Sequence, residues 1–352
     1  AYSQLDADSD NSAVDYSNAT LSATFEIVFW GGQRASRDSA QFALQASEFD
    51  QATVELTLLS GVANTYALTL SLQEQSRIAE LNLANAQNVL KLVQTRFDSG
   101  SATALELAQQ KSLVAAQQRQ LPLVRQQAID AQISLATLLG RPLQELVLGR
   151  EHFDQLSWPA IDAGVPSELL SRRPDIARAE AQLAAAQADV TVARAAMFPT
   201  LTLSAEIGSG ADRAGDILRS PFYNLTAGLL APVFNNGRLG AERDQALGRQ
   251  EELLESYRGA IINGFADVEK ALNSIRGLDE QRQWQSEELS QAQTAFNIAQ
   301  SRYEAGAEDL LTVLETQRTL YAAQDLNVQL RLSRMQASIA LYKALGGGWQ
   351  VL

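Results

Sequence analysis

The stretch RFDSGSATALELAQQKSLVAAQQ (residues 96–118) recurs, with changes, as RYEAGAEDLLTVLETQRTLYAAQ (residues 302–324). The offset between the two copies is 206 residues up to the glycine and 207 past it. Further upstream, FWGGQRASRD at 29–38 resembles FNNGRLGAERD at 234–244 with nearly the same offset. A period of this length predicts two halves that are built on one plan.

Each half contains a long proline-free segment rich in Ala, Leu, Gln, Glu and Arg, which favour helices. A turn that contains glycine, at 98–102 or 304–307, separates this segment from a second helical one. An unbroken helix over 33–97 would be about 97 Å long at about 1.5 Å per residue, which exceeds the diameter of a globular domain. We therefore predict hairpins of long helices that build a rod or a tube.

Two segments between the helices alternate apolar and polar residues: ATLSATFEIVF at 19–29 and TLTLSAEI at 200–207. This period of two predicts strands with one apolar face. The segment 222–234 alternates less clearly, and 2–9 resembles the end of a fourth strand. About 11 residues, tilted near 40°, cover about 28 Å, which is the apolar thickness of a bilayer.

The side chains predicted to face lipid are Leu21, Phe25, Ile27, Leu201, Leu203 and Ile207. The alternative is one face of an antiparallel sheet that packs on a soluble core, although no other strand-rich segment supplies a second layer. Four strands cannot close a barrel, since open edges do not face lipid and small barrels have about eight strands. The membrane hypothesis therefore requires several chains to pool their strands.

The composition argues against several classes of protein. Its 28 Lys and Arg against 41 Asp and Glu give a net charge of −13, which disfavours binding of nucleic acid. With no cysteine and one histidine, neither thiol catalysis nor a zinc site is expected, and no residue pattern indicates an enzyme. No run of 18 apolar residues marks a transmembrane helix.

Residues 172–203, RRPDIARAEAQLAAAQADVTVARAAMFPTLTL, resemble the hallmark segment of the outer-membrane efflux factors, the TolC and OprM superfamily with its NodT branch. The RFDSG and RYEAG turns, APVFNNGR at 231–238 and ALGGGW at 344–349 extend the resemblance over nearly the whole chain. Within that superfamily, the chain looks like the OprM-like channels that serve resistance-nodulation-division pumps.

The resemblance implies a mainly α fold with membrane β, in a homotrimer. Four strands per chain would close a 12-strand barrel in the bacterial outer membrane, and 12 helices would continue it as a periplasmic tunnel. The resemblance also implies a passive exit duct for small molecules such as drugs, which works with a periplasmic adaptor and an inner-membrane transporter and needs no cofactor. The expected parts are strands at 1–30 and 199–236, tunnel helices at 31–139, 167–198 and 237–345, and an equatorial belt at 140–166 and 346–352.

A soluble helical scaffold or coiled-coil interaction protein is the alternative function. It explains the helices but neither the alternating strands nor RRPDI. The repeat also leads us to expect an equivalent of the 168–198 helix upstream of Ala1, together with a signal peptide and any lipid-modified cysteine.

The hallmark residues are Arg172, Arg173, Pro174, Asp175 and Pro199. The first four are typical of a helix start, with proline in the first turn and an acidic residue near the positive end of the dipole. Pro199 is expected to stop the helix before the strand begins. The three charged residues could instead bind a substrate, but the pattern favours an ion pair at the helix start.

The glycine turns are the expected periplasmic tips of the hairpins, where a constriction would prevent leakage. The resemblance assigns adaptor contact to Gly100 and Gly306, a latch to Glu106 and Tyr303, and an apolar and an acidic ring to Leu311 and Glu315. Leu311 and Glu315 are four residues apart and therefore share a helix face. From the residues alone, Glu106 and Glu315 also fit a solvated helix face.

Overall fold

The computed structural model describes residues 17–27, 29–148, 153–156, 172–211 and 221–348. The chain divides into two compact units. The strand unit comprises the described parts of Ala1–Ala46 and Glu180–Ser256, and the hairpin unit comprises those of Ser47–Ala179 and Tyr257–Leu352. The strand end predicted at 2–9 and much of the predicted belt lie outside the described residues. No helix in the described part is both long and apolar enough to cross a membrane.

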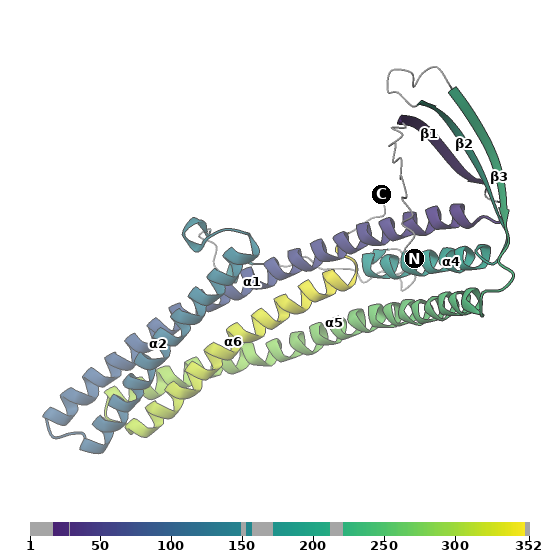
Figure 1. Cartoon of the computed structure of the whole chain (residues 1–352). Coiled ribbons are helices and arrows are strands. Elements are labelled where there is room, and N and C mark those ends of the chain that lie inside the picture. The colour runs from purple at the N-terminus through teal and green to yellow at the C-terminus, as the bar shows by residue number, and fades with distance from the viewer. Residues whose placement is uncertain (1–16, 28, 149–152, 157–171, 212–220, 349–352) are drawn as a thin grey trace, which may run out of the picture. The chain divides into compact units, whose positions relative to one another are not determined.

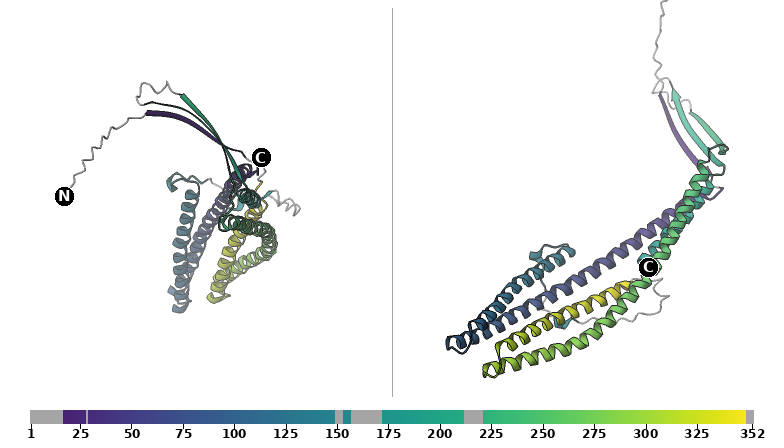
Figure 2. Two further views of the ribbon diagram at one scale, coloured as in Figure 1. Left: turned by 45° about the vertical axis from the view of Figure 1, so that its right-hand side comes forward. Right: turned by 90° about the horizontal axis from the view of Figure 1, so that it is seen from below.

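Two helical hairpins account for most of the chain. Their helices are α1 (Gly32–Asp98), α2 (Ala104–Leu138), α5 (Arg238–Glu304) and α6 (Leu310–Ala344). The two long helices have 67 residues each and the two returning helices 35 each. Corresponding bounds are 206 residues apart throughout, so the shift to 207 that the sequence alignment predicts past the glycine is not a feature of the backbone. Figures 1 and 2 show α2 folding back along α1, and α6 folding back along α5.

Glycines mark the ends of these helices at the same spacing in both halves. Three pairs have positive φ angles: Gly31 and Gly237 (76° and 78°), Gly100 and Gly306 (75° and 76°), and Gly140 and Gly346 (65° and 90°). Glycine adopts this left-handed conformation without the steric cost that a Cβ brings. The backbone therefore carries the repeat in its turns as well as in its helix lengths.

The core of the hairpin unit joins all four helices near the turns. Apolar side chains from alanine to tyrosine fill it, and Val93 and Val313 are fully buried. The largest cluster consists of Val89, Val93, Leu107, Leu113, Ala292, Phe296, Ala299, Tyr303, Leu310, Val313, Leu314, Leu320, Tyr321 and Ala323. Because each hairpin contributes one side of this cluster, neither hairpin buries its apolar face alone.

The described strands form one antiparallel sheet in the order β1-β2-β3 (Figure 1). They are β1 (Ser17–Ile27), β2 (Thr200–Ala211) and β3 (Pro221–Leu230). The second strand extends beyond the alternating segment 200–207, because β2 continues to Ala211. The third strand ends at Leu230 and not at Phe234. Pro232 explains the early end, since proline has no N–H to donate to a ladder.

Candidate functional site

The sheet register places most apolar side chains of the three strands on one face. Leu21 lies opposite Ile207, which lies opposite Tyr223. The next rows on this face are Ala23, Ala205 and Leu225; Phe25, Leu203 and Ala227; and Ile27, Leu201 and Leu229. Because side chains alternate along a strand, the opposite face carries Ser, Thr and Asn side chains together with Glu26 and Glu206, and it also carries Phe222 and Leu230 near the two ends of β3.

Among the described residues, many side chains of the apolar face are exposed. Leu21 is 72% exposed, Phe25 65% and Leu225 78%. A contiguous apolar surface of this kind is typical of an interface with lipid or with another protein. The six side chains that the sequence predicts to face lipid all lie on this face: Leu21, Phe25, Ile27, Leu201, Leu203 and Ile207.

Aromatic side chains connect the sheet to the helices of the strand unit. Pro199 stands between α4 (Pro174–Ala195) and β2. The indole Nε1 of Trp30 donates to the Pro199 carbonyl at 2.7 Å. The Trp30 ring also stacks on Phe198, with the ring centroids 4.7 Å apart. Trp30 therefore fixes the point where helix changes to strand.

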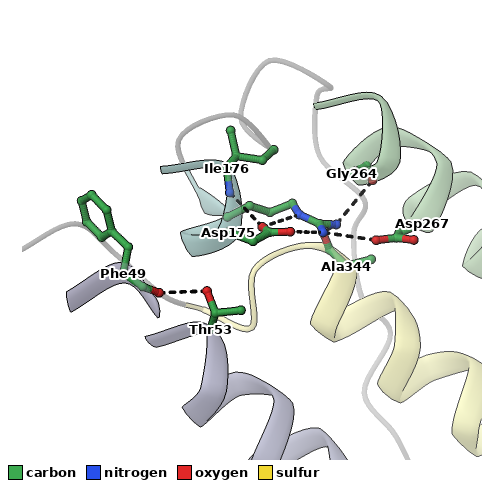
Figure 3. A network of polar contacts seen from close by, with 8 residues as sticks. Phe49, Thr53, Asp175, Ile176, Gly264, Asp267 and Ala344 are labelled. Atoms are coloured by element: carbon green, nitrogen blue, oxygen red, sulfur yellow. Dashed lines mark hydrogen bonds and ion pairs between the residues drawn. The ribbon is translucent and has the colours of Figure 1, made fainter. Parts of the chain in front are cut away.

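Arg173 is the centre of a polar cluster in the hairpin unit, drawn in Figure 3. Its guanidinium donates to both carboxylate oxygens of Asp175, at 3.0 and 2.7 Å, and to Asp267 at 3.2 Å. It also donates to the carbonyls of Ala344 at 3.1 Å and Gly264 at 3.5 Å. We call Arg173, Asp175 and Asp267 the Arg173 cluster. It joins the start of α4 to α5 and to the end of α6.

The cluster sets the charge of its carboxylate. Burial pushes the pKa of Asp175 upward, but hydrogen bonds and the positive charge of Arg173 outweigh burial and hold that pKa below its usual value. At the start of α4 the structure therefore contains an ion pair between Arg173 and Asp175. Gly346 packs against the residue before Arg173, and only glycine fits there, because a Cβ would lie 1.9 Å from the carbonyl oxygen of Arg172.

The turns at the hairpin tips are fixed by capping side chains. At the start of α2, the Thr103 hydroxyl accepts from the backbone N–H of Glu106 at 3.2 Å, and the Glu106 carboxylate accepts from the Thr103 N–H at 2.6 Å. At the start of α6, the Asp309 carboxylate accepts from the Thr312 N–H at 2.9 Å. This backbone hydrogen bond lowers the pKa of Asp309. Each returning helix therefore has a defined first turn.

A cation joins the two hairpins at their tips. Arg96, near the end of α1, donates to the carbonyl of Tyr303 at 2.8 Å, and its guanidinium lies 4.5 Å from the centre of the Tyr303 ring. The Tyr303 ring is buried, and its hydroxyl has no hydrogen-bond partner among the described residues. Glu106 makes its side-chain hydrogen bonds with Thr103. Within the described part of one chain, Tyr303 is therefore paired with Arg96 and not with Glu106.

The remaining predicted tip residues are on the surface. Gly100 and Gly306 are exposed in the turns. Leu311 is 53% exposed, and Glu315 is exposed one helical turn further along α6. An exposed leucine beside an exposed glutamate is an arrangement that a symmetric assembly would multiply into two rings.

The sequence model of the family described as outer membrane efflux protein matches residues 1–141 and 165–347. The chain belongs to this family. It is therefore an outer-membrane transport protein of a channel family and not an enzyme. Membership also excludes the soluble scaffold that the sequence leaves as an alternative. In the described part of this efflux protein, no group of three or more His, Cys, Asp or Glu side chains is placed to hold a metal ion.

Two solved structures and one curated relative are similar over nearly the whole efflux protein. It is 67% identical over 349 residues to the pyoverdine export outer membrane protein OpmQ of Pseudomonas aeruginosa, covering 99% of this chain and 74% of OpmQ. The CusC crystal structure matches with a TM-score of 0.86 at 30% identity, over 95% of this chain and 78% of CusC. The outer-membrane channel OprN matches with a TM-score of 0.88 at 25% identity, over 96% and 82%.

The sequence does not predict several contacts between the helices of the efflux protein. Buried polar side chains reach across to backbone carbonyls: Gln110 donates to Ala86 at 2.8 Å, and the Tyr321 hydroxyl to Asn82 at 2.8 Å. Burial raises the pKa of Tyr321 to about 12. Gln110 and Tyr321 belong to α2 and α6, and both carbonyls lie on α1. These bonds fix how the helices are aligned along their length, and a buried Gln in an amphipathic helix is the only sequence signal for them.

Proposed function

We propose that the chain is the passive outer-membrane channel of a tripartite efflux system, a homotrimer with a 12-strand barrel and a 12-helix periplasmic tunnel. The observation that carries the proposal is the register of the three strands, which gives the sheet one apolar and one polar face. Such a sheet suits a barrel wall with lipid outside and water inside. A small barrel has about eight strands, and the structure describes three in this chain, which favours a barrel wall shared by several chains.

The name of a relative narrows the cargo. OpmQ, which is 67% identical, is named for pyoverdine export, and we therefore propose a siderophore of that type as the cargo. A periplasmic adaptor would contact the exposed turns at Gly100 and Gly306, and an inner-membrane resistance-nodulation-division transporter would load the tunnel. The duct itself would do no chemistry.

Export in cells tests this function. Expression of the protein in the outer membrane of a host without its own siderophore duct is expected to restore siderophore to the medium. The host must retain the adaptor and the transporter. Trimers that insert into the outer membrane but restore no export would contradict the proposed cargo. A monomer that stays in solution without detergent would contradict the channel itself.

Ion selectivity is expected to favour cations. The polar face of the described strands contains Glu26 and Glu206 and neither Lys nor Arg. Three chains would therefore place six carboxylates along the pore wall. Reversal potentials in a salt gradient across a planar bilayer should show cation preference, and the double change Glu26→Gln with Glu206→Gln should reduce it. Glu80→Gln, which changes a carboxylate of the hairpin unit, is the control, and equal selectivity of all three proteins would contradict a lumenal polar face.

A closed tip is expected to limit conductance. Replacing Glu106 or Tyr303 with Ala should raise single-channel conductance in a planar bilayer, because each change removes a side chain that holds the turns in place. Glu106→Ala also removes a helix cap, at a cost of about 1 kcal/mol. Thr103→Ala removes the same cap and serves as the matched control, since it leaves the carboxylate in place.

Conductance of the control decides the role of Glu106. A rise with Glu106→Ala but not with Thr103→Ala supports a latch, whereas equal rises assign the effect to the cap. Tyr303→Phe should leave conductance unchanged, because the hydroxyl has no partner among the described residues and the ring keeps its place beside Arg96. Unchanged conductance for Glu106→Ala and Tyr303→Ala, in folded trimers, would contradict the latch assignment.

A further inference from the structure

A cavity lined by charged side chains lies in the hairpin unit, and it shares no lining residue with the Arg173 cluster or the tips. Its volume is about 210 Å³. Three arginines of α5 and α6 and the short helix η2 (Phe153–Gln155) surround it. We call it the arginine pocket, and its lining residues are Phe153, Leu156, Arg282, Arg331, Arg334, Met335 and Ser338.

One wall of the arginine pocket is anchored in the protein core. The Phe153 ring is buried in a cluster with Leu70 of α1 and Val328 of α6. Arg331 lies over this ring, with its guanidinium carbon 4.8 Å from the ring centre, and donates to the Phe153 carbonyl at 3.2 Å. It also forms an ion pair with Asp154. This wall is therefore built by the fold and not by an adaptable loop side chain.

The other wall holds two arginines that share one carboxylate. Arg334 donates to Asp279 at 2.6 Å and to the hydroxyl of Ser338. Arg282 Nη1 lies 4.0 Å from the same Asp279 oxygen, which is too far for a hydrogen bond. Across the pocket, three guanidinium groups thus face two carboxylates, an excess of one positive charge in a chain whose net charge is −13.

Several N–H groups of these three arginines have no acceptor among the described residues. A guanidinium has five N–H groups, and in the described part of the chain neither Arg331 Nε nor Arg334 Nη2 has an acceptor. The Arg331 and Arg334 side chains are 22% and 27% exposed, and neither of these two nitrogens is among the fully buried atoms without a partner, so both are accessible to a bound ligand. Arg282 has no hydrogen bond within the described residues. An acceptor with several oxygen atoms would pair with all three groups.

We propose that the arginine pocket binds a small oxyanion, a phosphate or a compact carboxylate, held by Arg282, Arg331 and Arg334. Planar guanidinium forks match the paired oxygen atoms of such anions, whereas a spherical chloride cannot bridge them in this way. The bound anion would link α5 and α6 to η2, and would thereby stabilise the hairpin unit. This inference does not depend on the proposed cargo or on channel activity.

Thermal unfolding of the full chain, purified in detergent, tests the site. Inorganic phosphate and malonate are titrated separately, each against sodium chloride of equal ionic strength. A ligand that binds only the folded state raises the unfolding temperature. We expect such a rise with phosphate, with malonate or with both, and the comparison identifies the preferred oxyanion. Calorimetric titration at constant temperature then gives the affinity.

Arg282→Gln is the decisive variant, because Arg282 makes no hydrogen bond within the part of the chain that the structure describes. This variant should lower the affinity for the oxyanion about tenfold or more, which is the effect of losing a charge-assisted hydrogen bond. Arg249→Gln, which removes an exposed arginine paired with Glu252 on the same helix, should leave the affinity unchanged. If Arg282→Gln does not fold, Arg282→Lys should show a smaller loss. Equal effects of oxyanions and chloride, or full affinity in the folded Arg282 variant, would overturn the proposal.

Discussion

Replacing Arg173 with Met is expected to lower the free energy of unfolding by about 3 kcal/mol per chain, because breaking a buried ion pair leaves the other partner without compensation. The Arg173 side chain is only 9% exposed. Methionine keeps most of its length but no donor, so the carboxylate of Asp175 and the carbonyl of Ala344 lose their shared partner. Thermal unfolding of the detergent-solubilised protein, followed by circular dichroism, measures the loss.

The same helix supplies the matched control. Arg178 pairs with Asp50, and both side chains are far more exposed than Arg173, at 40% and 51%. Exposed ion pairs contribute about 0–1 kcal/mol, so Arg178→Met should change stability little. Equal losses in the two variants would show that the Arg173 cluster holds α4, α5 and α6 no more firmly than a surface pair does.

Acid should remove part of the difference between the wild type and Arg173→Met. The pKa of Asp175 is lowered in the folded state, so its contribution is complete above the usual value of 3.8 and is lost as the pH falls toward the lower folded value. The two unfolding temperatures are therefore expected to converge below about pH 4. A gap that stays constant from neutral pH down to the acid limit would assign the effect to packing.

Local patterns predict what is local in this fold. Alternation places Phe25 and Leu203 on one face, because neighbouring side chains of a strand point in opposite directions. The repeat of RFDSG as RYEAG predicts two equivalent turns, since glycine at a left-handed position ends a helix wherever it occurs. The third strand is less regular, and its predicted end at residue 234 is four residues too late. Alternation does not show that Pro232 lacks the N–H that a hydrogen bond of the ladder would need.

Contacts between distant segments are beyond the reach of such patterns. RRPDI indicates a helix start, yet Asp267 and the Ala344 carbonyl, which complete the Arg173 cluster, lie 94 and 171 residues away. The partner of Tyr303 is Arg96, 207 residues away, and nothing in either motif indicates that choice. Periodicity reports which face a helix buries, while the identity of the side chain opposite depends on how two helices are aligned along their length.

Replacing Leu225 with Arg is expected to prevent stable insertion of the barrel. Leu225 lies in the middle of β3, in the same row as Ala205 and Ala23, and is 78% exposed. An arginine on the lipid face of a barrel costs about 2–4 kcal/mol near the bilayer midplane, and a homotrimer would contain three copies. Semi-native electrophoresis of the outer-membrane fraction should show loss of the heat-dissociable trimer.

The neighbouring residue separates lipid from water. Asn224 lies opposite Glu206 on the polar face, so Asn224→Arg adds the same side chain to the same strand but directs it toward the opposite side of the sheet. That variant should still insert and assemble, because a charged side chain in the lumen stays hydrated and gains a carboxylate neighbour. Loss of trimer in Asn224→Arg with normal assembly of Leu225→Arg would reverse the two faces, and equal behaviour would show that neither face meets the hydrocarbon of the membrane.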